Sequence, residues 1–230
     1  MDKRIIRKNM ADNNIYGEFK TEIVKPENIE KRSFEIILEE LNQMGIKLPE
    51  KEDKIIRRCI HTSADFDYAK TLRFSENAVD ICKDLIKKGA SIITDTNMAK
   101  AGINEKRLSN FGGKVYCFMA DPAVAAEAKE RGVTRATVSM EKASQLPGKK
   151  IFASGNAPTA LIRLYEMYKE GIFIPDFIIG VPVGFVNVEA AKDIIMTTDI
   201  PYIINKGRKG GSNIAAAICN ALIYDIPVDN

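Results

Sequence analysis

The chain has 230 residues, of which 45% are hydrophobic, and its 34 lysines and arginines nearly balance its 31 aspartates and glutamates. This length and apolar content suffice for one α/β domain with a substantial core, whereas a net charge of +3 is too small for the basic stripe that duplex nucleic acid requires. The four cysteines lie far apart, with no CxxC pair, and the single histidine of the chain cannot complete a zinc site with them, so we expect reduced thiols and no metal cluster.

The amino-terminal segment is charged throughout and lacks the apolar centre of a secretory signal, and no uncharged apolar run is long enough to span a bilayer. We therefore expect a cytoplasmic protein with no membrane partner. Residues 1–18 carry few apolar side chains and end in a polar, glycine-containing stretch, which predicts a flexible arm. Residues 19–230 contain no linker, low-complexity tract or repeat, which predicts a single domain.

Two helices are expected before the α/β part of the chain. Pro26 opens the first, whose apolar residues recur at near-helical spacing up to a stop at Gly45. The second is short and is capped by Asp53; its apolar residues form one stripe, and Arg57 and Arg58 fall on the other side.

His61, the only histidine of the chain, comes at the end of this second helix, and Asp65 and Asp67 follow it. Histidine is the side chain whose ordinary pKa lies nearest neutral pH, so His61 is the obvious candidate for acid–base chemistry. A lone histidine more often has a purely structural role, and this segment alone does not exclude that alternative.

From Ser75 onward, helical segments alternate with short apolar runs rich in β-branched residues. The expected strands are residues 91–94, 114–118, 150–153, 177–181 and 202–204. The expected helices are residues 75–88, 121–143 with a break at Gly132, 158–170, 187–196 and 211–224. Each gap has room for one crossover helix, which predicts a three-layer αβα sandwich around a mostly parallel, five-stranded sheet.

Ligands of such sheets bind beyond the carboxyl ends of the strands. The loops there are rich in Gly, Asn and Pro. They cover residues 95–102, 155–160, 182–186 and 206–212. The last loop, GRKGGS at residues 207–212, most resembles an anion site because its glycines let backbone amides point inward, although an ordinary helix entry with exposed basic residues is the alternative. Asp95 could act in catalysis, cap a loop or bind a ligand hydroxyl.

Six segments together carry more information than any one of them. They read IIRRCIHTSADFDYA, SIITDTNMAKAGI, GVTRAT, GNAPTALIRL, FIIGVPVGFVNVEAAKD and GRKGGSNIAAAICNAL. In this order, from about Pro26 to Leu222, they resemble the signature segments of the precorrin-8X methylmutase family, including its cobalt-precorrin-8 counterpart. The resemblance implies a flavodoxin-like αβα fold, a cytoplasmic homodimer and the transfer of a methyl group from C-11 to C-12 of a corrinoid precursor, precorrin-8 or its cobalt form. It implies no redox or nucleotide cofactor.

The resemblance also implies residue roles. The active-site histidine of the family matches His61, which would donate a proton or hydrogen bond to the macrocycle, and its substrate-facing arginine matches Arg135. The serine after that arginine is Ala136 here, and a second family serine is replaced near Lys192, which is itself kept. Cations expected to pair the substrate carboxylates are Arg73, Arg135, Arg208 and Lys209. The other residues expected at the substrate are Ser33, Arg58, Asp95, Met98, Gly155, Asn156, Gly184, Phe185, Gly210, Gly211 and Ser212.

Two other functions are compatible with parts of the sequence. A corrinoid carrier without turnover would keep the basic loops and would not need His61. A nucleotide- or sugar-phosphate enzyme of similar fold would need a phosphate loop, but the GRKGGS stretch matches neither G-x-x-x-x-G-K-[ST] nor G-x-G-x-x-G.

Overall fold

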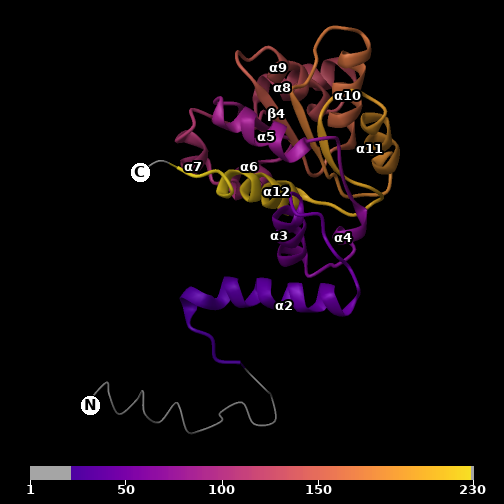
Figure 1. The fold of residues 1–230 in the computed structure, drawn as a ribbon. Coiled ribbons are helices and arrows are strands. Elements are labelled where there is room, and N and C mark those ends of the chain that lie inside the picture. The colour runs from indigo at the N-terminus through magenta and orange to yellow at the C-terminus, as the bar shows by residue number, and fades with distance from the viewer. Residues whose placement is uncertain (1–21, 229–230) are drawn as a thin grey trace, which may run out of the picture. The chain divides into compact units, whose positions relative to one another are not determined.

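A computed structural model describes residues 22–228 of the chain (Figure 1). The chain divides into two compact units, residues 1–36 and 37–230. The flexible arm expected at residues 1–18 lies outside the described residues. In the first unit, a 3₁₀ turn, η1 (Pro26–Asn28), leads into helix α2 (Ile29–Gln43), which continues into the second unit.

The second unit contains a six-stranded sheet in the order β1-β6-β5-β4-β2-β3. Its strands are β1 (Leu72–Phe74), β2 (Ser91–Thr94), β3 (Val115–Tyr116), β4 (Lys150–Ser154), β5 (Phe177–Gly180) and β6 (Tyr202–Asn205). The five strands from β2 to β6 are parallel and correspond to the five expected ones. Their order is that of flavodoxin, with the reversal of winding between β2 and β4. The α/β sandwich expected from the sequence is therefore confirmed.

Strand β1 is the difference from the expected sheet. It pairs antiparallel with β6 at the edge, Leu72 opposite Asn205, and only Leu72 of its three residues is buried. An edge strand this short and this polar carries no continuous apolar run, so its sequence gives no strand signal. An antiparallel edge on a parallel sheet is common in doubly wound folds.

The crossover helices follow the expected pattern. The helices after α2 are α3 (Asp53–Ser63), α4 (Tyr68–Thr71), α5 (Ala78–Lys87), α6 (Asn97–Gly102), α7 (Glu105–Ser109), α8 (Pro122–Arg131), α9 (Arg135–Ser144), α10 (Pro158–Lys169), α11 (Val188–Met196) and α12 (Ser212–Tyr224). The break expected at Gly132 separates α8 from α9, and Gly132 ends α8 with a positive φ of 65°. The short helices α4, α6 and α7 were not predicted.

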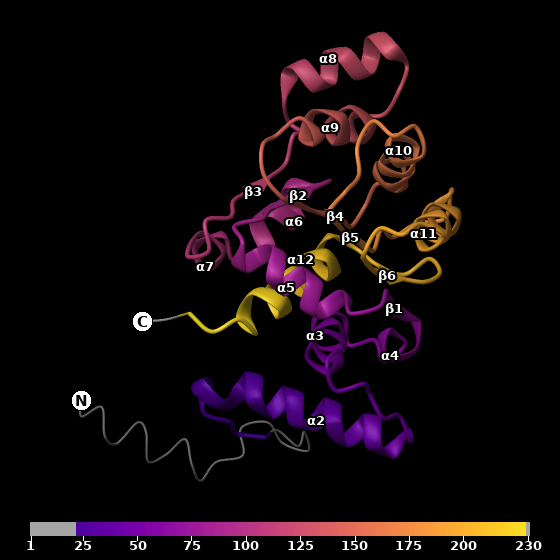
Figure 2. The same ribbon diagram turned by 45° about the horizontal axis from the view of Figure 1, so that its top comes forward.

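The helices form the outer layers of the sandwich. Figure 2 shows α9, α10 and α11 on one side of the sheet and α5 and α12 on the other. On the first side, Phe152 of β4 and Ile178 of β5 share a core with Leu161 and Leu164 of α10. Helix α12 is apolar almost all round because it lies between the sheet and α3, whose own apolar stripe packs against it. Within residues 22–228, no helix combines the length and apolar character needed to cross a membrane.

Candidate active site

The carboxyl ends of β2 and β4 are joined by one buried carboxylate. Asp95 follows β2 and is 1% exposed. Its Oδ2 accepts hydrogen bonds from Ser154 Oγ (2.9 Å) and from the amides of Asn156 (2.8 Å) and Ala157 (2.6 Å), and its Oδ1 accepts from the amide of Gly155 (2.9 Å). Both oxygens are thus used within the chain, so this geometry supports the loop-capping alternative for Asp95 and places Gly155 and Asn156 at the switch point of the sheet.

The glycines of these loops allow the loops to touch. A Cβ on Gly155 would lie 2.7 Å from Gly211 O, and one on Gly210 would lie 2.0 Å from Val181 O. The amide of Gly211 donates to Val181 O at 2.9 Å. Neither Gly155 nor Gly210 has a positive φ, so both are required for space rather than for backbone conformation.

Two hydroxyl groups connect the loop after β2 to the start of α12. Thr96 Oγ1, after β2, lies 2.8 Å from Ser212 Oγ at the start of α12. The structure therefore brings together the expected site residues of three separate segments, and they form one surface at the carboxyl edge of the sheet.

The segment after His61 meets the same surface. His61 is exposed on the last turn of α3, which ends at Ala64 with a positive φ of 54°. Lys209 Nζ lies 2.6 Å from Oδ2 of Asp65 and 2.6 Å from Oδ2 of Asp67. Burial raises the pKa of Asp65, but the hydrogen bonds from Lys209 and from the amide of Asp67, together with the charge of Lys209, outweigh it and hold this pKa below its ordinary value. The ion pairs join the carboxyl end of α3 to the glycine-rich loop.

Arg208 lies at the outer side of that loop. Its Nε donates to Glu189 Oε1 at 2.7 Å, and its guanidinium lies 5.5 Å from the centre of the Phe185 ring. Two of the cations expected to pair substrate carboxylates, Arg208 and Lys209, are thus already in ion pairs within the chain. A third, Arg73, donates to two backbone carbonyl groups.

Large apolar side chains are exposed on the loops and helix starts that follow β2 and β5. Phe185 is 82% exposed, and Val186 and Met98 are also mostly exposed. The amide of Gly184 donates to Arg208 O at 3.2 Å, which holds the loop after β5 against the loop after β6. Apolar surface beside charged groups is the composition that a flat, carboxylate-rimmed ring requires.

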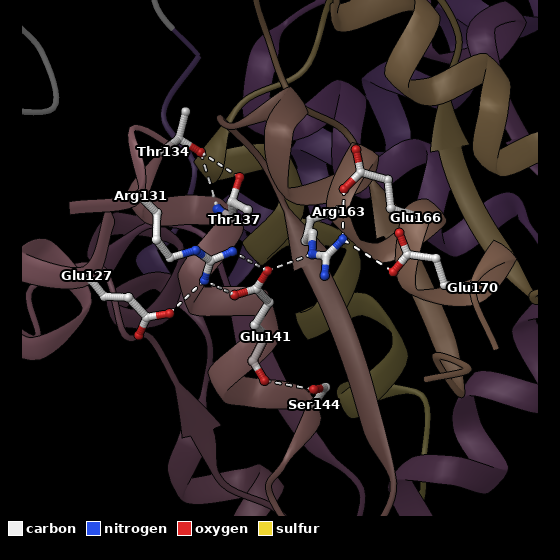
Figure 3. A network of polar contacts seen from close by, with 9 residues as sticks. All are labelled: Glu127, Arg131, Thr134, Thr137, Glu141, Ser144, Arg163, Glu166 and Glu170. Carbon is white, nitrogen blue, oxygen red and sulfur yellow. Dashed lines mark hydrogen bonds and ion pairs between the residues drawn. The ribbon is translucent and has the colours of Figure 1, made fainter. Parts of the chain in front are cut away.

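Arg135 is the first residue of α9, exposed, and placed by threonines. Thr134 caps the helix by accepting from the amide of Thr137 (Figure 3). Its hydroxyl also lies 2.8 Å from that of Thr159 at the start of α10. Because α10 begins directly after the Asn156 loop, this bond joins the Arg135 turn to the switch point. Ala136, at the position where the family resemblance implies a serine, is buried.

Arg58, another expected site residue, lies elsewhere. The Arg58 guanidinium lies 5.9 Å from the ring centre of Tyr224, at the carboxyl end of α12 and about 18 Å along the helix axis from Ser212. Ser33 belongs to the first unit, and its hydroxyl donates to Ile29 O within α2. Among residues 22–228, no group of three or more His, Cys, Asp and Glu side chains could hold a metal ion.

Comparison with known proteins identifies the family. A model of precorrin-8X methylmutase matches residues 28–225. A cobalt-precorrin-8 methylmutase of Priestia megaterium is 39% identical over 205 residues, covering 89% of this chain and 90% of that protein. One from Leptospira interrogans is 41% identical over 204 residues, covering 85% of this chain and 92% of that protein. The solved precorrin-8X methylmutase of Thermus thermophilus is 37% identical, with a TM-score of 0.75 over 86% of this chain and 96% of that chain. The chain belongs to the precorrin-8X methylmutase family.

Proposed function

We propose that this protein is an isomerase of cobalamin biosynthesis that moves a methyl group from C-11 to C-12 of precorrin-8 or cobalt-precorrin-8. The observation that carries the proposal is the family match over residues 28–225. Relatives that match over most of their length are named for the cobalt form and for precorrin-8X alike. The carrier and phosphate-enzyme alternatives have no comparable support.

The reaction balances within the substrate. The bond from the methyl carbon to C-11 breaks as its bond to C-12 forms, so no atom enters or leaves and we propose no cofactor. His61 donates a hydrogen bond to the conjugated ring next to the migrating methyl group, or a proton that the ring returns once the methyl group has moved, and thereby lowers the barrier. Its exposure at the end of α3, beside a segment tied to the glycine-rich loop, supports this role.

The surface at the carboxyl edge would bind the ring. Phe185 and Met98 offer apolar contact, while Arg135 and Asn156 offer exposed polar groups to the carboxylates at its rim. Arg208 and Lys209 would reach substrate carboxylates by exchanging or sharing their present partners. We place Asp95 beneath the ring site, where it holds the loop.

The test is to incubate the protein with precorrin-8 or with cobalt-precorrin-8 and to monitor the visible spectrum during the reaction. The native protein should produce the corrin chromophore. His61→Ala should bind the substrate and lose about 10²–10⁴-fold in kcat. Thr62→Ala, on the same exposed turn, is the control and should retain full activity, since the Thr62 hydroxyl only donates to Arg58 O.

Each other outcome assigns a different function. A native protein that binds and releases the corrinoid unchanged is a carrier. Full turnover in His61→Ala would show that another group donates the proton or hydrogen bond to the ring. No binding of either corrinoid rejects the proposal altogether.

We further propose that the protein is a cytoplasmic homodimer, as its family resemblance implies. Light scattering should then give twice the 25.6 kDa mass of the chain. A single-chain mass at the concentration of the activity assay contradicts the dimer.

A further inference from the structure

Lys192 is a charged residue in an apolar position. It lies on α11 with 0% exposure, on the buried stripe formed by Val188, Ala191 and Ile195. The spacing of these residues, i, i+3, i+4 and i+7, is the only trace that this burial leaves in the sequence. A buried ammonium group is costly unless its donors are satisfied.

Two of its three N–H donors are satisfied by backbone carbonyl groups. Lys192 Nζ donates to Gly207 O at 2.6 Å and to Lys209 O at 2.9 Å, and Asn205 Nδ2 also donates to Lys209 O, at 2.8 Å. Glu189 and Asp193, on the same helix, form no salt bridge with Lys192 in the described part of the chain, and Glu189 pairs with Arg208 instead. The ammonium therefore acts on the loop and not on a carboxylate.

The two hydrogen bonds from Lys192 orient the peptide groups of the loop. The carbonyl oxygens of residues 207, 208 and 209 all accept hydrogen bonds, the first and third from Lys192 Nζ and the second from the amide of Gly184. Within residues 22–228, the amides of residues 208–210 donate no hydrogen bond. The side chains of Arg208 and Lys209 leave on the exposed side, toward Glu189 and toward Asp65.

We propose that Lys192 is a positioning residue of the substrate site, whose buried ammonium fixes the backbone of residues 207–210 so that Arg208 and Lys209 face the substrate carboxylates. The nature of the ligand rests on the proposed function. The fixing of the loop does not, because it follows from the two contacts alone. Lys192 itself does not touch the substrate.

The loop contains its own probe. Trypsin cleaves after arginine and lysine, and residues 206, 208 and 209 are Lys, Arg and Lys. In Lys192→Met, which keeps the bulk of the side chain without its donors, cleavage in this loop should accelerate about tenfold or more because local opening becomes easier. The KM for precorrin-8 should rise about tenfold, with kcat within about threefold of the native value.

Lys150 provides a matched control. It too is buried, and its Nζ donates to two carbonyl oxygens, Leu146 O at 2.6 Å and Gly148 O at 2.7 Å, but at the amino end of β4. Lys150→Met removes an equivalent buried ammonium from the opposite edge of the sheet. It should leave the trypsin sensitivity of residues 206–209 and the KM unchanged.

The outcomes separate this proposal from the function on which it draws. Native-like resistance of the loop in Lys192→Met overturns it, as does equal loosening in Lys150→Met, which would indicate general destabilisation. If Lys192→Met does not fold, Lys192→Gln takes its place, because its shorter amide cannot reach both carbonyl groups. If trypsin cleaves the loop faster in Lys192→Met although the native protein binds neither precorrin-8 nor its cobalt form, that result refutes the proposed function and still supports the role of Lys192 in fixing the loop.

Discussion

Lys209 Nζ lies 2.6 Å from Oδ2 of Asp65, so the loop that begins α12 is joined to the chain segment that follows His61. The two residues are 144 positions apart in the sequence. The Lys209 ammonium is largely exposed, and such surface pairs contribute about 0–1 kcal/mol to stability. Its importance is therefore expected in the geometry of the site rather than in the stability of the fold.

Replacing Lys209 by methionine should affect catalysis far more than folding. We expect kcat/KM for precorrin-8 to fall about tenfold, while the free energy of unfolding changes by less than about 1 kcal/mol. Asp65→Asn should lower kcat/KM less, because Asp67 still pairs with Lys209, and the double variant should lose no more than Lys209→Met alone, because Asp65 acts through its contact with Lys209. Lys206→Met is the control. Additive losses in the double variant would show that the two residues act separately.

The sequence was sufficient for most of the fold, because the five parallel strands are apolar runs separated by helical segments of regular length. The short edge strand β1 and the helices α4, α6 and α7 were missed, since three to six residues leave too little periodicity to recognise. The clustering of the loop glycines was also predictable, because the carboxyl ends of parallel strands share one edge.

The partners of the charged residues were not predictable. Arg208 and Lys209 were expected to be available for substrate, but Glu189 and Asp65 pair with them across 19 and 144 residues of sequence. Such pairs depend on tertiary packing and leave no local pattern. Asp95 had three possible roles in the sequence, and only the structure shows its oxygens occupied by the amides of the next loop.

Asp95→Asn tests whether that carboxylate shapes the switch-point loop. An amide NH₂ in place of one oxygen would face backbone N–H donors, so we expect a loss of about 3 kcal/mol in the free energy of unfolding and weaker corrinoid binding. Asp176→Asn is the control, because Asp176 also accepts from a backbone amide, that of Lys150, at the amino edge of the sheet. It should lower stability without affecting binding. Unchanged binding in Asp95→Asn contradicts the positioning role.

Lys192 should make stability depend on alkaline pH. Burial lowers its pKa from 10.5 to about 8. The folded protein therefore loses this proton near pH 8 while the unfolded chain keeps it to about 10.5, so unfolding takes up a proton between these values. The free energy of unfolding of the native protein should rise relative to that of Lys192→Met by about 1–3 kcal/mol over this window, as measured by urea denaturation. If the difference in the free energy of unfolding between the native protein and Lys192→Met stayed constant from pH 7 to pH 10.5, the pKa of Lys192 would not be lowered in the folded protein.

Glu141 should contribute to stability rather than to catalysis. Its carboxylate on α9 accepts from Arg131 of α8 (2.5 and 2.9 Å) and from Arg163 Nε of α10 (2.7 Å), so it joins three helices (Figure 3). Glu141→Gln should cost about 1–3 kcal/mol, because the negative charge is lost and the oxygen that accepts from Arg131 Nη1 becomes an NH₂ donor. Glu127→Gln, which removes only one exposed partner of Arg131, should cost less than about 0.5 kcal/mol.

The lowered pKa of Glu141 determines how its contribution to stability changes with pH. Hydrogen bonds from Arg131 hold the pKa of Glu141 below 4.5, the ordinary value of this carboxyl group. The stabilisation is therefore complete above pH 4.5 and is lost as pH falls through the lower, folded-state pKa. The difference in the free energy of unfolding between native protein and Glu141→Gln should shrink with acidification, while the KM for precorrin-8 stays native at neutral pH because Thr134 and Thr159 still hold the Arg135 turn. A raised KM in Glu141→Gln would mean that the helix network, and not the threonine pair, sets the position of Arg135.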